Sequence, residues 1–278
     1  CNNLLQYLCN RLLHKLINEE WIFMKKGLTA LFLSLVMTFM LCACGSPKAS
    51  DINDFLYEAK DGEITITGYT GKDLEVVIPD VIDNRPVKYI GNSAFEEYDM
   101  TSIYVPEGIE MIHENAFRHC NMLENISLPN SLKCFYCENN GGDKIPATAY
   151  DSLEYTKWFT NQPDGILYNN NLLLDYKGEN DLTGTLEVKD GTVSILAKAF
   201  DGQYGIDTIT LPNSVKYIGD YAFTGCSSVK SLSVPDGCVV GTRVLGEFSD
   251  FKVVGNYTTY IDGVEYKGSP QGGLSRVE

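Results

Sequence analysis

Hydrophobic residues recur along this chain in short runs that alternate with polar residues and end in proline. Five runs share this form, and they are Val76-Val77-Ile78-Pro79, Ile103-Tyr104-Val105-Pro106, Ile126-Ser127-Leu128-Pro129, Ile209-Thr210-Leu211-Pro212 and Leu232-Ser233-Val234-Pro235. Proline cannot donate to a strand ladder and favours extended geometry in the residue before it, so each run predicts a short strand that stops at its proline. Alternation then sends Ile103 and Val105 to one face and Ser102 and Tyr104 to the other.

A second pattern, Val/Ile-x-x-Ile-x-x-x-Ala-Phe, follows most of these runs. It occurs at 87–95, 109–117 and 215–223, and Ala199-Phe200 belongs to the same set although Thr192 stands where Val or Ile is expected. Both patterns have one period, because the spacing is 23 residues from Pro106 to Pro129 and also from Phe200 to Phe223. Two markers with one period indicate stacked repeats. We expect this stretch to turn back across the core, with Phe as its largest apolar plug.

The segments Tyr89-Ile90-Gly91-Asn92-Ser93-Ala94-Phe95 and 217–226 resemble BspA-type leucine-rich repeats, in which a strand, a Pro turn, an Ile-Gly step and an Ala-Phe pair recur. The resemblance covers roughly residues 53–237. It implies a repeat solenoid, that is, a β-rich leucine-rich-repeat array with parallel short strands, an N-terminal β cap and an irregular, hairpin-containing insertion. A single turn of this size cannot cover its own apolar faces, so we expect stability to come from stacking.

The repeat pattern divides residues 53–278 into three regions. We expect an N-terminal cap and first strand at 53–78, repeats at 79–238 with an irregular segment at 133–184, and a hairpin or the start of a further repeat at 239–278. The distance from Phe117 to Phe200 is 83 residues, so the pattern is interrupted and then resumes in register. Within the interruption, two apolar runs flank Asn169-Asn170-Asn171, which predicts a β-hairpin.

The first part of the chain has the form of an export signal. Residues 1–23 precede the first Met and are interpreted as an upstream untranslated or unstructured segment, and 24–43 as a lipoprotein signal peptide. Leu41-Cys42-Ala43-Cys44 resembles a bacterial lipobox, which implies lipid on Cys44 and a tether at 44–52. The alternative is an ordinary cleaved signal that leaves Cys44 as a free thiol. The lipid interpretation places the protein on the extracellular face of a bacterial cell membrane, held by its lipid alone.

Composition narrows the class of partner. Without residues 1–43 the chain keeps 18 basic and 35 acidic residues, a net charge of −17. Such a surface repels phosphate backbones, so we expect no nucleic-acid partner. Five cysteines follow Cys44, an odd number that excludes complete internal pairing. Cys120 and Cys226 occupy equivalent repeat positions, where we expect them to fill a small apolar slot.

The outward strand positions are the candidate binding face. They are small, polar and nearly uncharged, and we name them the outer row: Ser102, Tyr104, Asn125, Ser127, Thr208, Thr210, Ser231 and Ser233. This composition suits a shallow face that holds an extended partner, although a merely solvated ladder would look the same. The BspA resemblance implies a surface-exposed protein that adheres to a protein or surface glycan. The alternative is a structural envelope spacer without a ligand of its own, presenting the loops around Trp158.

Residues that carry catalytic chemistry are scarce. His113 and His119 lie six apart without a convergent ligand set, and Cys134 and Cys137 have redox spacing without the βαβ context of redox proteins. The acidic candidates Glu96-Glu97 and Asp201 are better explained as exposed turn residues. We therefore expect no enzyme activity, no metal and no cofactor.

Overall fold

The fold is described from a computed structural model, for residues 48–138, 144–244, 252–261, 264–271 and 274–277. The interpretations of 1–23, of 24–43 and of Cys44 lie outside these residues, as do residues 44–47 of the proposed tether. Residues 49–278 form one compact unit that contains both hydrophobic cores of the protein. Of the helices described, none has the length and apolar character to cross a membrane.

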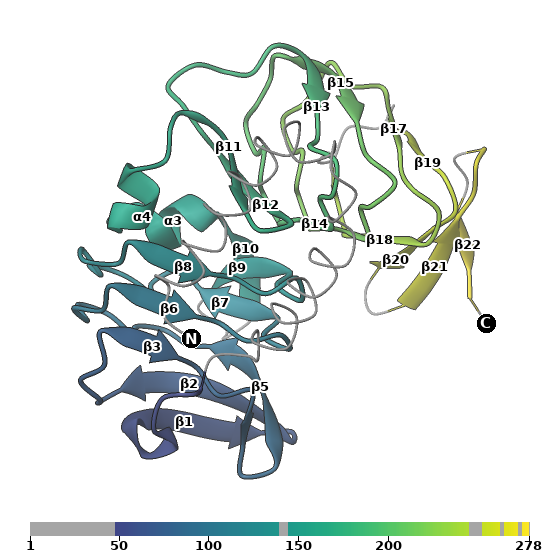
Figure 1. Cartoon of the computed structure of the whole chain (residues 1–278). Helices are drawn as coiled ribbons and strands as arrows, with labels where there is room; N and C mark the ends of the chain where they lie inside the picture. The colour runs from purple at the N-terminus through teal and green to yellow at the C-terminus, as the bar shows by residue number, and fades with distance from the viewer. Residues whose placement is uncertain (1–47, 139–143, 245–251, 262–263, 272–273, 278) are drawn as a thin grey trace, which may run out of the picture. The chain divides into compact units, whose positions relative to one another are not determined.

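The first half of the array is built on one sheet whose spatial order is β1–β2–β5–β7–β9–β10, with β4 paired to β5 (Figure 1). A short 3-10 helix, Ile52–Asp54, precedes it. The strands are β1 (Phe55–Lys60), β2 (Glu63–Tyr69), β4 (Val81–Ile82), β5 (Arg85–Ile90), β7 (Met111–His113), β9 (Cys134–Glu138) and β10 (Lys144–Ala147). The β1–β2 hairpin is the expected N-terminal cap. In β2 every second side chain, starting with Ile64, is buried, as the alternation predicted.

The proline-ended runs form a second, parallel set of strands. In the first half these are β3 (Glu75–Val77), β6 (Ser102–Tyr104) and β8 (Asn125–Ser127), which pair in the order β3–β6–β8. Residues 23 apart lie side by side, since Ser102 pairs with Asn125 and Ile103 with Ile126. Ile103 and Val105 are buried, which confirms the predicted alternation.

The second half repeats this arrangement. Its long sheet has the order β11–β12–β14–β16–β18–β20–β21–β22, and two short parallel pairs, β13–β15 and β17–β19, accompany it. The strands are β11 (Gly165–Asn169), β12 (Leu172–Lys177), β13 (Gly184–Glu187), β14 (Ser194–Ile195), β15 (Ile206–Thr210), β16 (Tyr217–Ile218), β17 (Ser231–Ser233), β18 (Cys238–Val240), β19 (Lys252–Val254), β20 (Tyr257–Ile261), β21 (Val264–Gly268) and β22 (Leu274–Arg276). β20 and β21 are antiparallel, as expected for the C-terminal hairpin.

One expectation is corrected by these sheets. The stretch that leads to Ala-Phe does not simply turn across the core, because it opens with a second parallel strand in each turn. Ile90 pairs with Ile112, and Ile195 pairs with Ile218, which in turn pairs with Val240. Apart from the six-residue β5, each of these strands has only two or three residues, too few for alternation to reveal a strand in the sequence.

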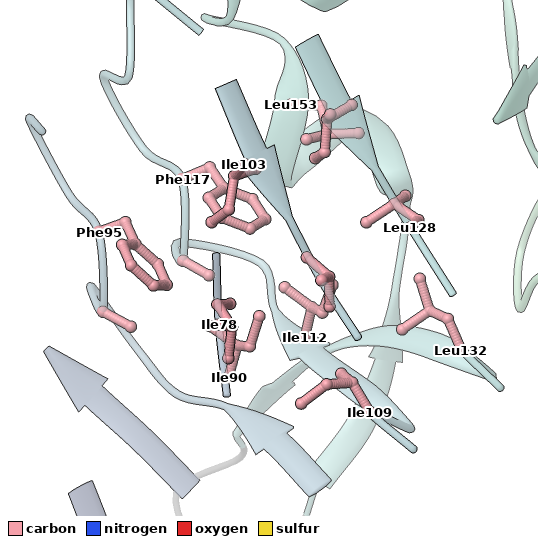
Figure 2. Packing of buried hydrophobic residues seen from close by; sticks show 14 of the residues in the cluster. Ile78, Ile90, Phe95, Ile103, Ile109, Ile112, Phe117, Leu128, Leu132 and Leu153 are labelled. Atoms are coloured by element: carbon pink, nitrogen blue, oxygen red, sulfur yellow. The ribbon is translucent and has the colours of Figure 1, made fainter. Parts of the chain in front are cut away.

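The core is a stack of equivalent side chains from successive turns (Figure 2). Phe95 and Phe117 are stacked with ring centroids 5.8 Å apart, and Phe200 and Phe223 with centroids 5.5 Å apart and planes at 8°. All four are at most 2% exposed, so they are the predicted plugs. The stack is not continuous, because the first pair belongs to one hydrophobic cluster and the second pair to another.

The interruption holds two short helices against the predicted hairpin. The helices are α3 (Ala149–Leu153) and α4 (Lys157–Thr160), and β12 supplies a charged group to each. The Asp175 carboxylate accepts from the Tyr150 backbone N–H, at the first turn of α3. The Lys177 ammonium donates to the carbonyls of Phe159 and Gln162, where α4 ends. Both placements match the helix dipole, so the hairpin orients the helices.

The Ile-Gly step allows successive turns to approach closely. A Cβ built on Gly219 would lie 2.3 Å from the backbone nitrogen of Ala197 in the preceding turn. Gly219 N–H donates to the Ile195 carbonyl, so this contact also carries a hydrogen bond between turns. A side chain at this position would force the two turns apart.

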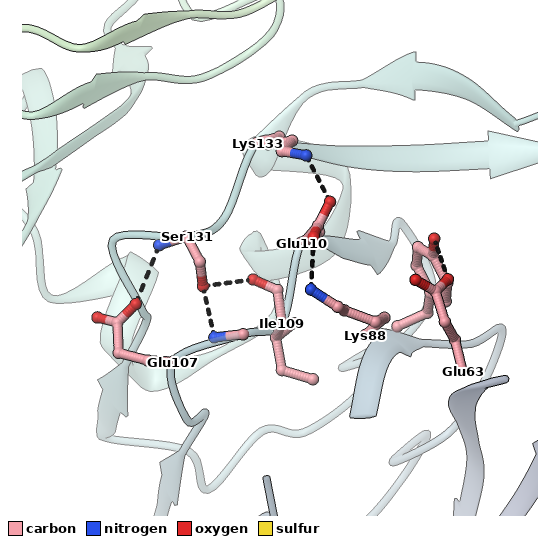
Figure 3. A network of polar contacts seen from close by, with 9 residues as sticks. Glu63, Lys88, Glu107, Ile109, Glu110, Ser131 and Lys133 are labelled. Carbon is pink, nitrogen blue, oxygen red and sulfur yellow. Dashed lines mark hydrogen bonds and ion pairs between the residues drawn. The ribbon is translucent and has the colours of Figure 1, made fainter. Parts of the chain in front are cut away.

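Polar contacts repeat with the same period (Figure 3). Glu110 forms ion pairs with Lys88 at 2.6 Å in the turn before it and with Lys133 in the turn after it. Burial alone would raise the pKa of Glu110, but hydrogen bonds from Lys133 and Lys88 outweigh burial and lower it. Ser131 accepts from Gly108 N–H and donates to the Ile109 carbonyl, again one turn back. These contacts hold the register of neighbouring turns.

Candidate functional site

The outer row lies on the outward side of the proline-ended strands, as its alternation predicted. In the first half, Ser102, Tyr104 and Ser127 are half-buried and Asn125 is exposed. The parallel register places Glu75, Ser102 and Asn125 in one column, and Val77, Tyr104 and Ser127 in the next. The first half of the row is therefore a small patch three strands wide.

The second half of the row is more exposed. Thr208, Thr210, Ser231 and Ser233 all have exposed side chains. Their columns include residues from strands that no proline marks: Thr185 and Glu187 in β13, and Lys252 in β19. The flanking charges of Glu75, Glu187 and Lys252 show that the face is less uniformly neutral than the eight predicted residues are.

The row is divided where β8 ends the first ladder. Among the described strands, none pairs with the outer edge of β8; instead the buried Asn169 side chain accepts from Leu128 N–H at 3.0 Å and donates to the Ile126 carbonyl at 2.8 Å. Asn170 adds a bond to the Leu128 carbonyl at 3.2 Å. An amide side chain thus replaces the peptide group of a further strand. The sequence signal is the Asn169-Asn170-Asn171 run, which predicts a turn but not this contact.

A second outward face was not predicted from the sequence. It belongs to the long sheets, where Tyr89 and Met111 are paired neighbours and Tyr217 pairs with Val239. The Tyr89 hydroxyl donates to Glu63 at 2.9 Å, and burial together with this bond raises the pKa of Tyr89 to about 12. These four side chains are half-buried rather than open, so this face offers less accessible surface than the outer row.

Of the cysteines, one pair fills apolar slots in the core and another pair lies on opposite faces of one strand. Cys120 and Cys226 are buried, and the Cys120 thiol donates to the Phe95 carbonyl at 2.9 Å, so the expected small slot is confirmed. Cys134 and Cys137 both lie in the extended strand β9. An offset of three residues in a strand directs side chains to opposite faces, so this pair lacks the geometry of a redox motif. In the described part of the chain, no disulfide joins any of the five cysteines.

The two histidines have different surroundings. His113 is buried in β7, where its Nδ1 accepts from Asn115 N–H at 3.1 Å and its ring meets Tyr136 edge-on. The His119 ring lies 5.1 Å from the Tyr155 ring at a surface turn. Within the ranges that the structure describes, no three His, Cys, Asp or Glu residues gather closely enough to hold a metal ion.

The acidic candidates lie at the Ala-Phe turns. Glu96 forms an ion pair with Arg118 at 3.5 Å, while Glu97 and Asp201 are exposed. These placements agree with their interpretation as turn residues.

The aromatic residues of the interruption divide into buried and exposed side chains. Trp158 and Phe159 are buried, because both side chains of α4 pack into the first core. The exposed aromatic residues there are Tyr150 and Tyr155, at 47% and 49% exposure.

Comparison with solved structures finds bacterial leucine-rich-repeat proteins. A leucine-rich-repeat protein of T. pallidum is 23% identical, with 75% of this chain and 82% of that chain covered and a TM-score of 0.36. A leucine-rich cell surface protein of Faecalibacterium prausnitzii is 22% identical (85% and 62% covered, TM-score 0.35). A leucine-rich-repeat protein of Bacteroides ovatus is 19% identical (74% and 52% covered, TM-score 0.32). The search of curated proteins gives no match.

A family model described as "BspA type Leucine rich repeat region" matches in six copies, over residues 78–141 and 179–247. The gap between these ranges coincides with the helices and hairpin of the interruption, and both ranges carry the stacked Phe residues and the parallel ladders. The chain is therefore a protein of BspA-type leucine-rich repeats.

Proposed function

We propose that this protein is a cell-surface binding protein that holds a protein or surface-glycan partner on its outer row and performs no catalysis of its own. The observation that carries the proposal is the fixed register within each of the three ladders that hold the row, β3–β6–β8, β13–β15 and β17–β19. Within each ladder, parallel pairing sets outward side chains at about 4.8 Å from strand to strand, on a framework whose inner residues are buried, apart from the half-buried Leu211 and Val253. A rigid, regularly spaced face can contact an extended partner at many weak points without a large ordering cost.

The chemistry of the row supports binding over catalysis. Thr208, Thr210, Ser231 and Ser233 offer exposed hydroxyl groups that both donate and accept hydrogen bonds. The side chains that most often act as general acid or base are His and the carboxyl groups, set in a pocket, and the row contains neither. The acidic balance of the chain, −15 in total, disfavours a nucleic-acid partner. A lipid on Cys44 would hold this face at the outside of the bacterial membrane.

Binding of residues 49–278 to immobilised host matrix proteins and bacterial surface glycans tests the proposal. Thr210→Arg with Ser233→Arg would place two bulky cations on the row, and we expect it to weaken binding at least tenfold. The matched control is Ser227→Arg with Ser228→Arg, two exposed serines that precede β17 and do not belong to the row. Equal loss in both variants, or none in either, would contradict a binding role for the row.

The second candidate is a structural spacer. It is favoured by the half-buried state of Ser102, Tyr104 and Ser127, which leaves the first half of the row with little exposed surface. A spacer predicts that no matrix or surface component binds at micromolar concentration, while the fold and its thermal stability remain intact.

A further inference from the structure

The N-terminal cap ends in a strand whose outer edge is open. Among the strands that the structure describes, β1 pairs with β2 alone, and every residue of β1 except Phe55 is exposed. An open edge presents a row of backbone donors and acceptors that another strand can satisfy. The opposite edge of the same sheet, β10, carries Pro146, which cannot donate to a ladder. β1 contains no proline.

The hairpin turn determines which backbone groups of β1 face away from β2. Lys60 pairs with Glu63 across the two-residue turn Asp61-Gly62, whose φ values are 53° and 84°. In such a hairpin the pair that flanks the turn is hydrogen-bonded, and successive pairs alternate. The N–H and C=O groups of Ala59 and Tyr57 therefore point to the outer edge, whereas those of Lys60 and Glu58 point to β2.

The geometry points to antiparallel pairing of β1 with β1 of a second copy of this chain, about a two-fold axis at Ala59. In an antiparallel ladder, two opposed residues either both hydrogen-bond to each other or both do not. The two-fold axis of a symmetric pair must therefore place one residue opposite the same residue of the other copy. An axis at Glu58 or at Lys60 would oppose like charges. An axis at Ala59 opposes Glu58 to Lys60 of the other copy, twice.

The other symmetric arrangements, with the axis at Phe55, Leu56 or Tyr57, are excluded by a hydrogen bond already present. Each of these would require the Phe55 N–H to pair with the second copy, but that group donates to the Ile52 carbonyl. Charge complementarity, backbone phase and the existing Phe55 hydrogen bond thus select the same register.

Sedimentation equilibrium of residues 49–278, from about one micromolar to about one millimolar, tests the dimer. We expect the average mass to rise toward twice the monomer. Glu58→Lys and Lys60→Glu should each remain monomeric, because each opposes like charges. An equimolar mixture of the two variants should associate again, since both lysines of the first variant would then face both glutamates of the second. A mixture that stays monomeric, or a wild-type chain that does, overturns the proposal.

Ala59→Pro is the second variant. It removes the central edge donor and leaves the β1–β2 bonds in place, because the Ala59 N–H points away from β2. We expect a monomer whose circular dichroism equals that of wild type. A folded Ala59→Pro variant that still dimerises would show that the copies meet elsewhere, and would overturn the proposal.

Discussion

Leu173 and Leu174 are neighbours in β12 and both are fully buried, yet they pack into different cores: Leu174 with the first cluster and Leu173 with the second. Alternation along a strand gives this result when both faces are covered. β12 pairs in parallel with β14, so it is also the first rung of the second ladder. One strand thus joins two halves that the family pattern leaves separate.

Truncating these two leucines should affect different halves of the protein. Leu174→Ala and Leu173→Ala should each lower the free energy of unfolding by about 2–5 kcal/mol, because each leaves a cavity in a packed core. In hydrogen exchange, protection should fall mainly around Phe117 for Leu174→Ala and mainly around Phe223 for Leu173→Ala. Identical exchange patterns in the two variants would contradict the division into two cores.

We expect the Asn169 side chain to stabilise the fold through its two hydrogen bonds and not through its shape. Asn169→Asp keeps the size but removes the donor to the Ile126 carbonyl, leaving a buried acceptor beside a buried carboxyl group. We expect a loss of about 1–3 kcal/mol of stability in urea unfolding. Asn171→Asp, at an exposed position of the same turn, is the control and should be within about 0.5 kcal/mol of wild type.

Two glycines at equivalent Ile-Gly steps should differ in how strongly they resist replacement, because the turns approach each other more closely at one of them. A Cβ on Gly219 would meet backbone at 2.3 Å, whereas a Cβ on Gly91 would meet the Ile66 carbonyl at 3.1 Å. Gly219→Ala should therefore cost several kcal/mol, in the range of about 3–5, and Gly91→Ala clearly less. Thermal unfolding of the two variants measures the order, and a reversed order would be inconsistent with the stacking described.

Three buried thiols should make the protein sensitive to alkali. Burial raises the pKa of Cys120, Cys226 and Cys238 from the usual 9.0 to about 12. Between these values the unfolded chain has lost protons that the folded chain keeps, so stability is complete below pH 9 and falls as pH rises toward 12. The loss is on the order of 2 kcal/mol per thiol by pH 11.

Urea unfolding at pH 8 and at pH 11 measures this loss. Cys226→Ala should lose less stability over that interval than wild type, because one of the titrating groups is absent. Comparing the variant with wild type cancels the similar contribution of Tyr69 and Tyr89, whose pKa values are also raised to about 12. If Cys226→Ala loses as much stability between pH 8 and pH 11 as wild type does, Cys226 is not buried as described.

The sequence predicted those elements whose residues carry strong local signals. Proline after an alternating run marked β6 and β17, and the Ala-Phe pairs marked the plugs. β13 has no following proline, so Thr185 and Glu187 were missed as members of the outward columns. Thr192 was recognised as a departure, and the structure explains it, because its hydroxyl donates to the Lys189 carbonyl and is satisfied inside the turn.

The candidate site was predictable in position but not in extent. Alternation alone placed Thr208 and Thr210 outward, because a one-residue shift would have buried them. The break at β8 depends on the side chain of Asn169, which lies far along the chain from the Ile126 and Leu128 backbone groups that it binds. No local pattern encodes such a contact.

Register is the central claim, and disulfide cross-linking across the ladder tests it most directly. Ser102 and Asn125 are paired neighbours in β6 and β8, whose Cα atoms in a parallel ladder lie about 5 Å apart, within disulfide range. Ser102 and Ser127 are offset by two residues, which puts them about 8 Å apart and outside that range. In a Cys137→Ser background, Ser102→Cys with Asn125→Cys should form a disulfide under mild oxidation, and Ser102→Cys with Ser127→Cys should not. Cross-linking of the offset pair alone, or of neither pair, would contradict the stacked array.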